Sequence, residues 1–118
     1  KDYASWGVDY LKYDNCWAQG IDPVTRYSAM GDALREAGRP ILYSICDWGR
    51  EDPSKWGRSV GGNSWRTTPD IRASWDSIIQ KADKNDKWWQ YAGPGGWNDP
   101  DMLEVGNPGI SDTEARTH

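Results

Sequence analysis

The strongest constraint on the fold is a strand, helix, strand pattern in the first 46 residues. Residues 40–46 read Pro-Ile-Leu-Tyr-Ser-Ile-Cys, a nearly continuous apolar run typical of a strand buried on both faces. An earlier short strand ends at Asp14, and its alternation places Lys12 and Asp14 on one face. Between the two, apolar residues at helical spacing predict a helix that Gly38 and Pro40 end. Such a βαβ unit should have parallel strands.

The rest of the chain continues to alternate short strands with helical pieces. The predicted elements are a helical turn at 53–56, a third strand at 64–68, a helix through 71–82, a short aromatic fourth strand at 88–92, a loop at 93–103, and a tail at 104–118 that begins as a loop and enters a helix. Regular βα repetition predicts part of a (β/α)8 barrel, with a doubly wound sheet as the other possibility. A full barrel needs about 250 residues, so 118 residues would form about half of one and leave strand edges unpaired.

Composition and charge exclude several classes of partner. The net charge is −4, with no basic run, which argues against a nucleic-acid or anionic-membrane surface. No apolar stretch is long enough to span a bilayer, and the first residues do not form a signal peptide. Nine Trp and six Tyr with no Phe favour rings that both stack and form hydrogen bonds.

The two cysteines each follow a predicted strand. If those strands are neighbours, their ends lie about 5 Å apart, within reach of disulfide geometry. A Cys16–Cys46 disulfide would imply an oxidising compartment. A metal pair is the competing interpretation, but it lacks partners because His118 is the only His.

Acidic residues follow the predicted strands. The set is Asp14, Asp47, Asp70, Asp99 and Asp101. There is no Ser/His pair, phosphate-binding Gly-Lys motif or dinucleotide fingerprint. Locally, Asp70 could be the N-terminal acid of the next helix, and Lys12 with Asp14 a surface ion pair. Carboxylates beside aromatic rings are typical of a sugar site, and glycoside hydrolysis needs two carboxyl groups with separate roles. The loop at 93–103 lacks the spacing of a calcium loop, so no metal is predicted.

Three motifs closely resemble the α-galactosidases of glycoside hydrolase family 27, particularly the plant and fungal forms. They are YLKYDNC at 10–16, SWRTTPDI at 64–71 and AGPGGWNDPDML at 92–103. The resemblance covers nearly the whole chain, in order. It implies an α/β fold, a partial (β/α)8 TIM barrel with about strands 4 to 7. Residues 1–118 would be a fragment of one catalytic domain, without a complete second domain.

The resemblance also implies an activity and a set of site residues. The enzyme would be a retaining exo-glycosidase that removes terminal α-D-galactosyl residues from oligosaccharides, galactomannans or glycolipids by double displacement. Asp14 matches the nucleophile and Asp70 the general acid/base. The residues that match substrate-binding positions are Lys12, Cys46, Asp47, Trp48, Arg66, Asp101 and Met102. Cys16 and Cys46 match a family disulfide, and no cofactor or metal is implied.

These roles carry physical expectations. Lys12 should keep Asp14 ionised and therefore nucleophilic. Asp70 should be protonated in the free enzyme, which requires burial or a neighbouring carboxylate. Because Arg66 would oppose this, we expect Arg66 to turn toward the substrate instead of pairing with Asp70.

Two positions bear on specificity, and alternatives to plain galactoside hydrolysis stay open. Many family members have Glu where this chain has Asp47, which leaves recognition at the 2-position of the sugar open, and bulky Trp48 disfavours an acetamido group there. The alternatives are α-N-acetylgalactosaminidase, β-L-arabinopyranosidase, a non-catalytic carbohydrate-binding module and a purely structural fragment. The predicted partner is a galactose-containing carbohydrate, with no nucleic acid or membrane and with the oligomeric state open. The predicted location is secreted, extracellular or vacuolar-lysosomal, the signal peptide lying outside a fragment that is inactive by itself.

Overall fold

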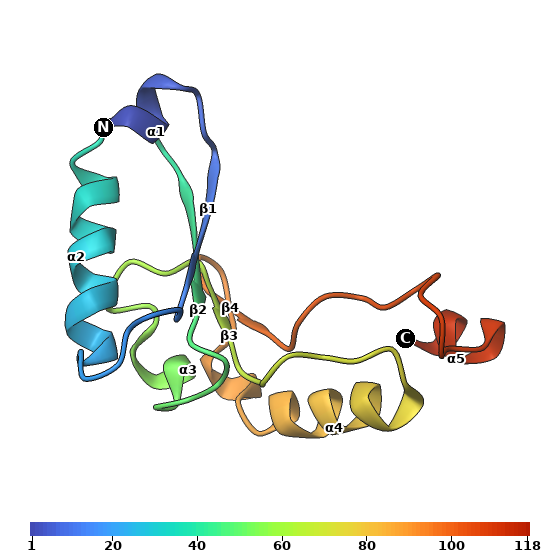
Figure 1. Ribbon diagram of the computed structural model, residues 1–118. Coiled ribbons are helices and arrows are strands. Elements are labelled where there is room, and N and C mark those ends of the chain that lie inside the picture. Colours follow the sequence, from blue (N-terminus) through green and yellow to red (C-terminus); the bar gives the residue numbers. More distant parts are fainter.

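A computed structural model describes residues 1–118 and contains one parallel four-stranded sheet with helices beside it (Figure 1). The strands are β1 (Tyr10–Asp14), β2 (Leu42–Cys46), β3 (Ser64–Arg66) and β4 (Trp97–Asp99). The helices are α1 (Asp2–Ser5), α2 (Pro23–Arg35), α3 (Pro53–Trp56), α4 (Trp75–Asp86), the 3-10 helix η1 (Trp89–Tyr91) and α5 (Asp112–Thr117). The spatial order β1-β2-β3-β4 follows the chain order and every pair is parallel. A barrel has this order, whereas a doubly wound sheet reverses it.

Helix α2 forms where capping residues flank an apolar stripe. Asp22 is the N-cap and accepts a hydrogen bond from the Thr25 amide at 2.7 Å, and Pro23 occupies the first turn. At Gly31 an added Cβ would lie 2.0 Å from the Val60 carbonyl oxygen. The helix therefore packs directly on the segment that precedes β3.

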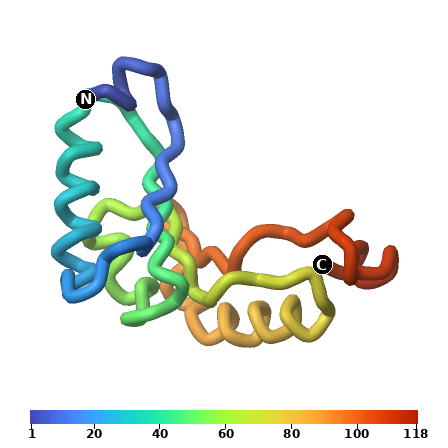
Figure 2. Tube along the Cα trace, viewed as in Figure 1, coloured from blue at the N-terminus to red at the C-terminus, as the bar shows by residue number.

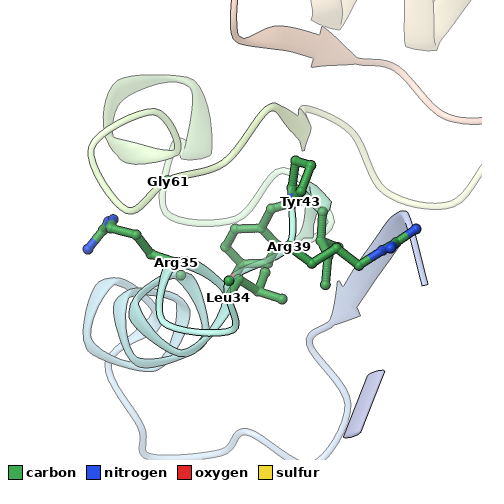
Figure 3. Close-up of a pocket in the computed structure, with 9 residues that line it drawn as sticks. Leu34, Arg35, Arg39, Tyr43 and Gly61 are labelled. Atoms are coloured by element: carbon green, nitrogen blue, oxygen red, sulfur yellow. The ribbon is translucent and has the colours of Figure 1, made fainter. Parts of the chain in front are cut away.

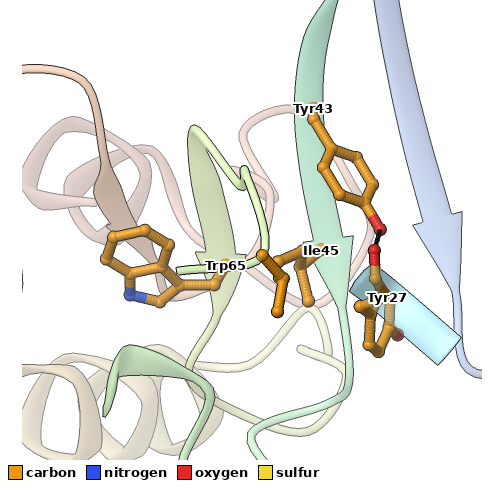
Figure 4. Close-up of a cluster of buried hydrophobic side chains, with 5 residues drawn as sticks. Tyr27, Tyr43, Ile45 and Trp65 are labelled. Carbon is orange, nitrogen blue, oxygen red and sulfur yellow. Dashed lines mark hydrogen bonds between the residues drawn. The ribbon is translucent and has the colours of Figure 1, made fainter. Parts of the chain in front are cut away.

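The apolar core lies between the sheet and helices α2 and α3. It consists of Tyr27, Tyr43, Ile45, Val60 and Trp65, which are at most 4% exposed (Figure 4). The Tyr43 hydroxyl donates to the Tyr27 carbonyl at 3.1 Å, and the Trp65 indole donates to the Asn98 side chain at 2.7 Å. These bonds favour the burial of Tyr43 and Trp65, whereas the Tyr27 hydroxyl is buried without a hydrogen bond.

The two edges of the sheet are unpaired, as predicted for part of a barrel. On the edge strands β1 and β4, Tyr10 is 54% exposed and Trp97 is 55% exposed. Lys12, Ser44 and Ser64 lie in register across β1, β2 and β3. This row of polar side chains belongs to the face opposite the core, because side chains alternate along each strand.

Two sequence predictions of secondary structure are wrong. Residues 88–92 contain the 3-10 helix η1 and not a strand, and the fourth strand is β4. Paired hydrogen bonds between Gly93 and Gly96 close a tight turn just before β4, and this turn redirects the chain into the sheet. Helix α4 begins at Trp75 with Ser74 as its N-cap, so Asp70 is not a helix N-terminal acid.

The segments that follow β3 and β4 run side by side, away from the sheet and along α4 (Figure 2). The Thr68 hydroxyl donates to the Pro100 carbonyl at 2.8 Å, and the Ile71 amide donates to the Asp101 carboxylate at 2.7 Å. This pairing brings the residues after two strands to one place. No helix in the structure has the length and apolar character that crossing a membrane requires.

Candidate active site

A cleft of about 390 Å³ lies at the carboxyl ends of the strands. Its lining residues are Lys12, Asp14, Cys16, Trp48, Arg66, Asp70, Ile71, Asp101, Met102 and Glu104. Seven of the nine predicted catalytic and substrate-binding residues are in this set, and the other two, Cys46 and Asp47, are buried at the end of β2. In barrels this end of the sheet is where active sites lie. The structure therefore brings the predicted residues together, while their individual roles stay predictions.

Asp14 is held at the end of β1 from two sides. Its carboxylate accepts hydrogen bonds from the Asn15 amide at 2.7 Å and from the Cys16 thiol at 3.3 Å. Its backbone carbonyl accepts one from Arg26 Nη1 at 2.9 Å. Because main chain and side chain are both anchored, the carboxylate has a defined direction into the cleft.

Arg26, which sequence reasoning missed, clamps the end of β1. Its guanidinium also donates to the Asn15 side chain and lies over the rings of Tyr13 and Tyr27, 5.0 and 4.3 Å from their centroids. Stacking on two rings orients the guanidinium fork. The only sequence signal was a cation in the first turns of the helix that follows Asp14.

The two cysteines are free thiols in the structure, so the predicted disulfide is not present. Cys16 is exposed and Cys46 is buried. The hydrogen bond with Asp14 raises the pKa of the Cys16 thiol, and burial raises the pKa of the Cys46 thiol to about 11. Register pairs Asp14 with Cys46 across β1 and β2, so both thiols lie near the same carboxylate.

Arg66 joins two carboxylates, contrary to the expectation that it turns away from Asp70. Its Nη2 lies 2.8 Å from Asp70 Oδ1 and 2.9 Å from Asp101 Oδ2. The Arg66 side chain is 2% exposed, and that of Asp70 is 79% exposed. The burial expected for Asp70 is therefore absent. The pair forms because no helix begins until Trp75, which leaves the chain after Arg66 free to bring Asp70 back to the guanidinium.

Asp101 is the buried partner of Arg66. Its side chain is 5% exposed and also accepts hydrogen bonds from the amides of Ile71 and Met102, at 2.7 and 2.8 Å. Its backbone lies at φ 104°, a strained region for a residue with a side chain. Trp48, on the facing loop, has φ 55°. Strained backbone thus occurs at two positions that line the cleft.

Asp47 lies beneath the cleft and lacks a partner for one carboxylate oxygen. The residue is 1% exposed, and its Oδ2 is buried without a hydrogen bond. Burial raises its pKa to about 6, opposed in part by the charge of Arg26. Gly49 holds this loop close to β3, because its amide donates to the Arg66 carbonyl and an added Cβ would lie 2.3 Å from the Thr67 carbonyl oxygen.

Ile71 and Glu104 also line the cleft, and the sequence did not predict them as site residues. Ile71 acts through its backbone amide, which carries no side-chain signal. Glu104 comes from a loop that the sequence does not connect to any strand end. No group of three or more His, Cys, Asp or Glu side chains is arranged to hold a metal ion.

A second pocket, of about 440 Å³, lies between α2 and the chain that enters β2 (Figure 3). Leu34, Arg35, Arg39, Tyr43 and Gly61 are among its lining residues, and none of the lining residues is an acid. It lies toward the amino end of β2, the side of a barrel associated with stability. The carboxylate-lined cleft is therefore the candidate site.

Comparisons with known proteins identify the family of the chain. A family model described as alpha galactosidase A matches residues 1–118. The alpha-galactosidase of Cyamopsis tetragonoloba is 62% identical over 118 residues, a match that covers 100% of this chain and 28% of that protein. The chain spans about three tenths of the length of the curated relatives it matches.

Solved structures give the same result. Alpha-galactosidase I from Mortierella vinacea superposes with a TM-score of 0.91 at 40% identity, covering 99% of this chain and 36% of that one. An alpha-galactosidase from Saccharomyces cerevisiae, solved with raffinose, has a TM-score of 0.83 at 38% identity, covering 98% of this chain and 31% of that one. These similarities confirm the predicted partial (β/α)8 fold.

Proposed function

Because the chain belongs to the alpha galactosidase A family, we propose that it forms the central part of the catalytic domain of a retaining α-galactosidase. The substrates are galactosides with a terminal, non-reducing α-D-galactosyl unit. The observation that carries the proposal is the cleft in which Asp14 and Asp70 line the same space as Lys12, Arg66 and Asp101.

In this proposal Asp14 is the nucleophile. Its carboxylate attacks the anomeric carbon of galactose, the bond to the leaving oxygen breaks, and a covalent galactosyl-enzyme forms. Lys12, two residues away on the same strand face, lines the cleft beside it and can donate to a sugar hydroxyl. Arg26 fixes the direction of attack through the Asp14 carbonyl.

Asp70 is the general acid and then the general base. Its exposed carboxyl group faces solvent at the rim, so it can exchange protons with water before and after each turnover. Protonated Asp70 gives its proton to the leaving oxygen, and the resulting carboxylate activates the water that releases galactose. Arg66 holds Asp70 and Asp101 on one nitrogen, which places a carboxylate from each of two loops beside the sugar.

The remaining proposed contacts surround the sugar. Met102 and Trp48 supply apolar surface on opposite loops of the cleft, and Asp101 accepts from a galactose hydroxyl. The bulk of Trp48 favours a hydroxyl over an acetamido group at the 2-position of the sugar.

We further propose that Cys16 and Cys46 form a disulfide in the mature protein, which is exported to an oxidising compartment. Cys46 is the last residue of β2, Cys16 lies just beyond the end of β1, and the register of these neighbouring strands pairs Asp14 with Cys46. Alkylation of the native protein followed by mass spectrometry tests this. A mass in which both thiols are alkylated without prior reduction would contradict it.

The test of the function is hydrolysis of an aryl α-D-galactoside by the full-length enzyme, beside the Asp14→Gly variant with and without azide. The proposal expects activity in the native enzyme, loss in Asp14→Gly, and azide rescue that yields the β-galactosyl azide. An active Asp14→Gly variant would remove Asp14 from the mechanism. If the folded native enzyme prefers a β-L-arabinopyranoside or an α-N-acetylgalactosaminide to the galactoside, the preferred sugar is the substrate and galactose is not.

A further inference from the structure

A groove distinct from the pocket beside α2 adjoins the active cleft on the side of Asp70. Its volume is about 780 Å³, twice that of the cleft, and the two share Trp48, Asp70 and Ile71 as lining residues. The groove lies between the loop that follows β2, the segment that follows β3, and the end of α4. Because these elements follow one another in the chain, the groove is built without the unpaired edges of the sheet.

Four cations line this groove with a single acid. Arg50, Arg72, Lys84 and Lys87 are all exposed, and Asp70 is the only carboxylate among the lining residues. None of the four cationic side chains forms an ion pair or a hydrogen bond in the structure. Asp70 is itself paired with Arg66. The groove therefore concentrates positive charge on a chain whose net charge is −4.

The charge is not explained by helix stability alone. Lys84 and Lys87 are at the end of α4, where cations interact favourably with the helix dipole. Arg50 and Arg72 come from two separate loops, and the dipole gives no reason for them to approach the same space. Unscreened like charges repel one another, so their convergence is favourable when an anion lies between them.

The groove begins at Asp70, where the leaving group of the proposed reaction departs. In the proposed mechanism Asp70 protonates the glycosidic oxygen, so the sugar beyond that oxygen lies on the outer side of Asp70. Trp48 forms a wall of both spaces, and the guanidinium of Arg50 lies 4.9 Å from the centroid of its ring. Trp88 provides a second ring farther along the groove. Rings for stacking and cations for an anion thus occur in one place.

We propose that this groove is an aglycone subsite that favours galactosides whose next unit carries a carboxylate or a phosphate. The proposal rests on the proposed function, because it needs the galactosyl unit in the active cleft. Arg50 and Arg72 supply planar donor pairs that match the oxygens of such anions, and Lys84 and Lys87 add point charges.

The test compares two isosteric substrates in the full-length enzyme, 3-carboxyphenyl and 3-carbamoylphenyl α-D-galactoside. The first is charged and the second neutral. The expected result is a kcat/KM ratio about fivefold in favour of the carboxylate at low salt, falling toward one as sodium chloride is added. The double variant Lys84→Gln/Lys87→Gln, outside the active cleft, removes two of the four cations and should lower this preference while it keeps its rate on the neutral substrate. Arg35→Gln, which removes an exposed cation on α2, should keep both the preference for the carboxylate and the rate on the neutral substrate.

The outcomes separate this proposal from the proposed function. Equal ratios in the native enzyme and the double variant, with both substrates hydrolysed, would overturn the subsite alone. Failure to hydrolyse either substrate would overturn the function and the subsite with it. A second pair, α-galactosyl-glucuronate and α-galactosyl-glucose phosphate against the neutral disaccharide, identifies the anion. Preference for either supports the subsite, and preference for neither counts against it.

Discussion

Asp47 and Asp101 are both nearly buried acids that follow parallel strands, yet only the Asp101 side chain forms an ion pair and hydrogen bonds. Asp101 meets Arg66 and two backbone amides. Asp47 has a buried oxygen without a hydrogen bond, and its pKa rises to about 6. Burial penalises the charged form of Asp47, and the charge of Arg26 offsets this penalty only in part. Two acids with little exposure therefore differ in their hydrogen bonds, and Asp47 is the one that lacks them.

The difference corresponds to different tasks. Asp101 fixes Arg66, and through it the position of Asp70. Asp47 carries Trp48 into the cleft, and a neutral carboxyl group serves that purpose. The predictions below alter one member of the comparison at a time.

The largest effect is expected from Asp101→Asn, which leaves Arg66 without its buried counter-charge. Breaking one side of a buried ion pair costs about 3 kcal/mol. Chemical denaturation of the full-length enzyme should show this loss, and galactoside hydrolysis should fall with it. The matched control is Asp70→Asn, which removes the exposed partner of the same guanidinium. It should change stability by less than about 1 kcal/mol. Equal losses of stability in the two variants would show that the burial of Asp101 does not set the contribution of its ion pair.

The next largest effect is a gain in stability on replacing Asp47. Its pKa rises from 3.8 to about 6 on folding, so the folded state binds the proton more tightly than the unfolded state. Stability should then fall as the pH rises from about 4 to about 6, by about 2–3 kcal/mol, and this group should contribute no further change above that. Asp47→Asn should remove this part of the pH dependence and be more stable than the native enzyme at pH 7.

Denaturation at several pH values checks this second prediction. Asp83→Asn, on the exposed surface of α4, is the control and should leave the slope between pH 4 and 6 unchanged. If Asp47→Asn follows the native curve at every pH, Asp47 has a partner that the structure does not contain.

A smaller effect is expected at Arg26, whose charge acts on Asp47 and whose hydrogen bonds hold Asp14. Arg26→Gln should lower kcat about tenfold, because a small displacement of a nucleophile is costly. KM should change little, since Arg26 does not line the cleft. Arg26→Lys keeps the charge near Asp47 but loses the guanidinium fork. It should retain the pH dependence of stability while kcat still falls. A rise in KM with unchanged kcat would assign Arg26 to substrate binding.

The sequence predicts the framework of this comparison well. Strands β1 and β2 and helix α2 follow from an apolar run, a helical period and Gly and Pro at the boundaries, all of them local signals. Strand β4 was missed because three residues, Trp97–Asp99, follow a glycine-rich turn and carry no alternating pattern. Its place in the sheet depends on pairing with β3, which is a long-range contact.

The sequence predicted most of the residues that line the cleft, but not which of their charged side chains form ion pairs. Motif positions indicated which residues share the cleft. The Arg66–Asp70 pair could not be predicted, because it depends on α4 beginning at Trp75 and not at Ile71, where the sequence predicts it. The contrast between Asp47 and Asp101 also depends on long-range contacts, since Arg66 and Ile71 reach Asp101 from a different strand and loop.

The smallest effect is expected where neither partner is buried. Arg35 and Asp32 form an ion pair on α2 at 2.8 Å, with side chains 68% and 63% exposed. The Arg66–Asp101 pair has nearly the same length, 2.9 Å, but is 2% and 5% exposed. Water screens the first pair, so Arg35→Gln should cost at most about 0.5 kcal/mol. Denaturation of Arg35→Gln beside Asp101→Asn tests whether burial, and not distance, sets the contribution of these ion pairs. Similar losses in the two variants would refute that account, and a ratio of about six or more would support it.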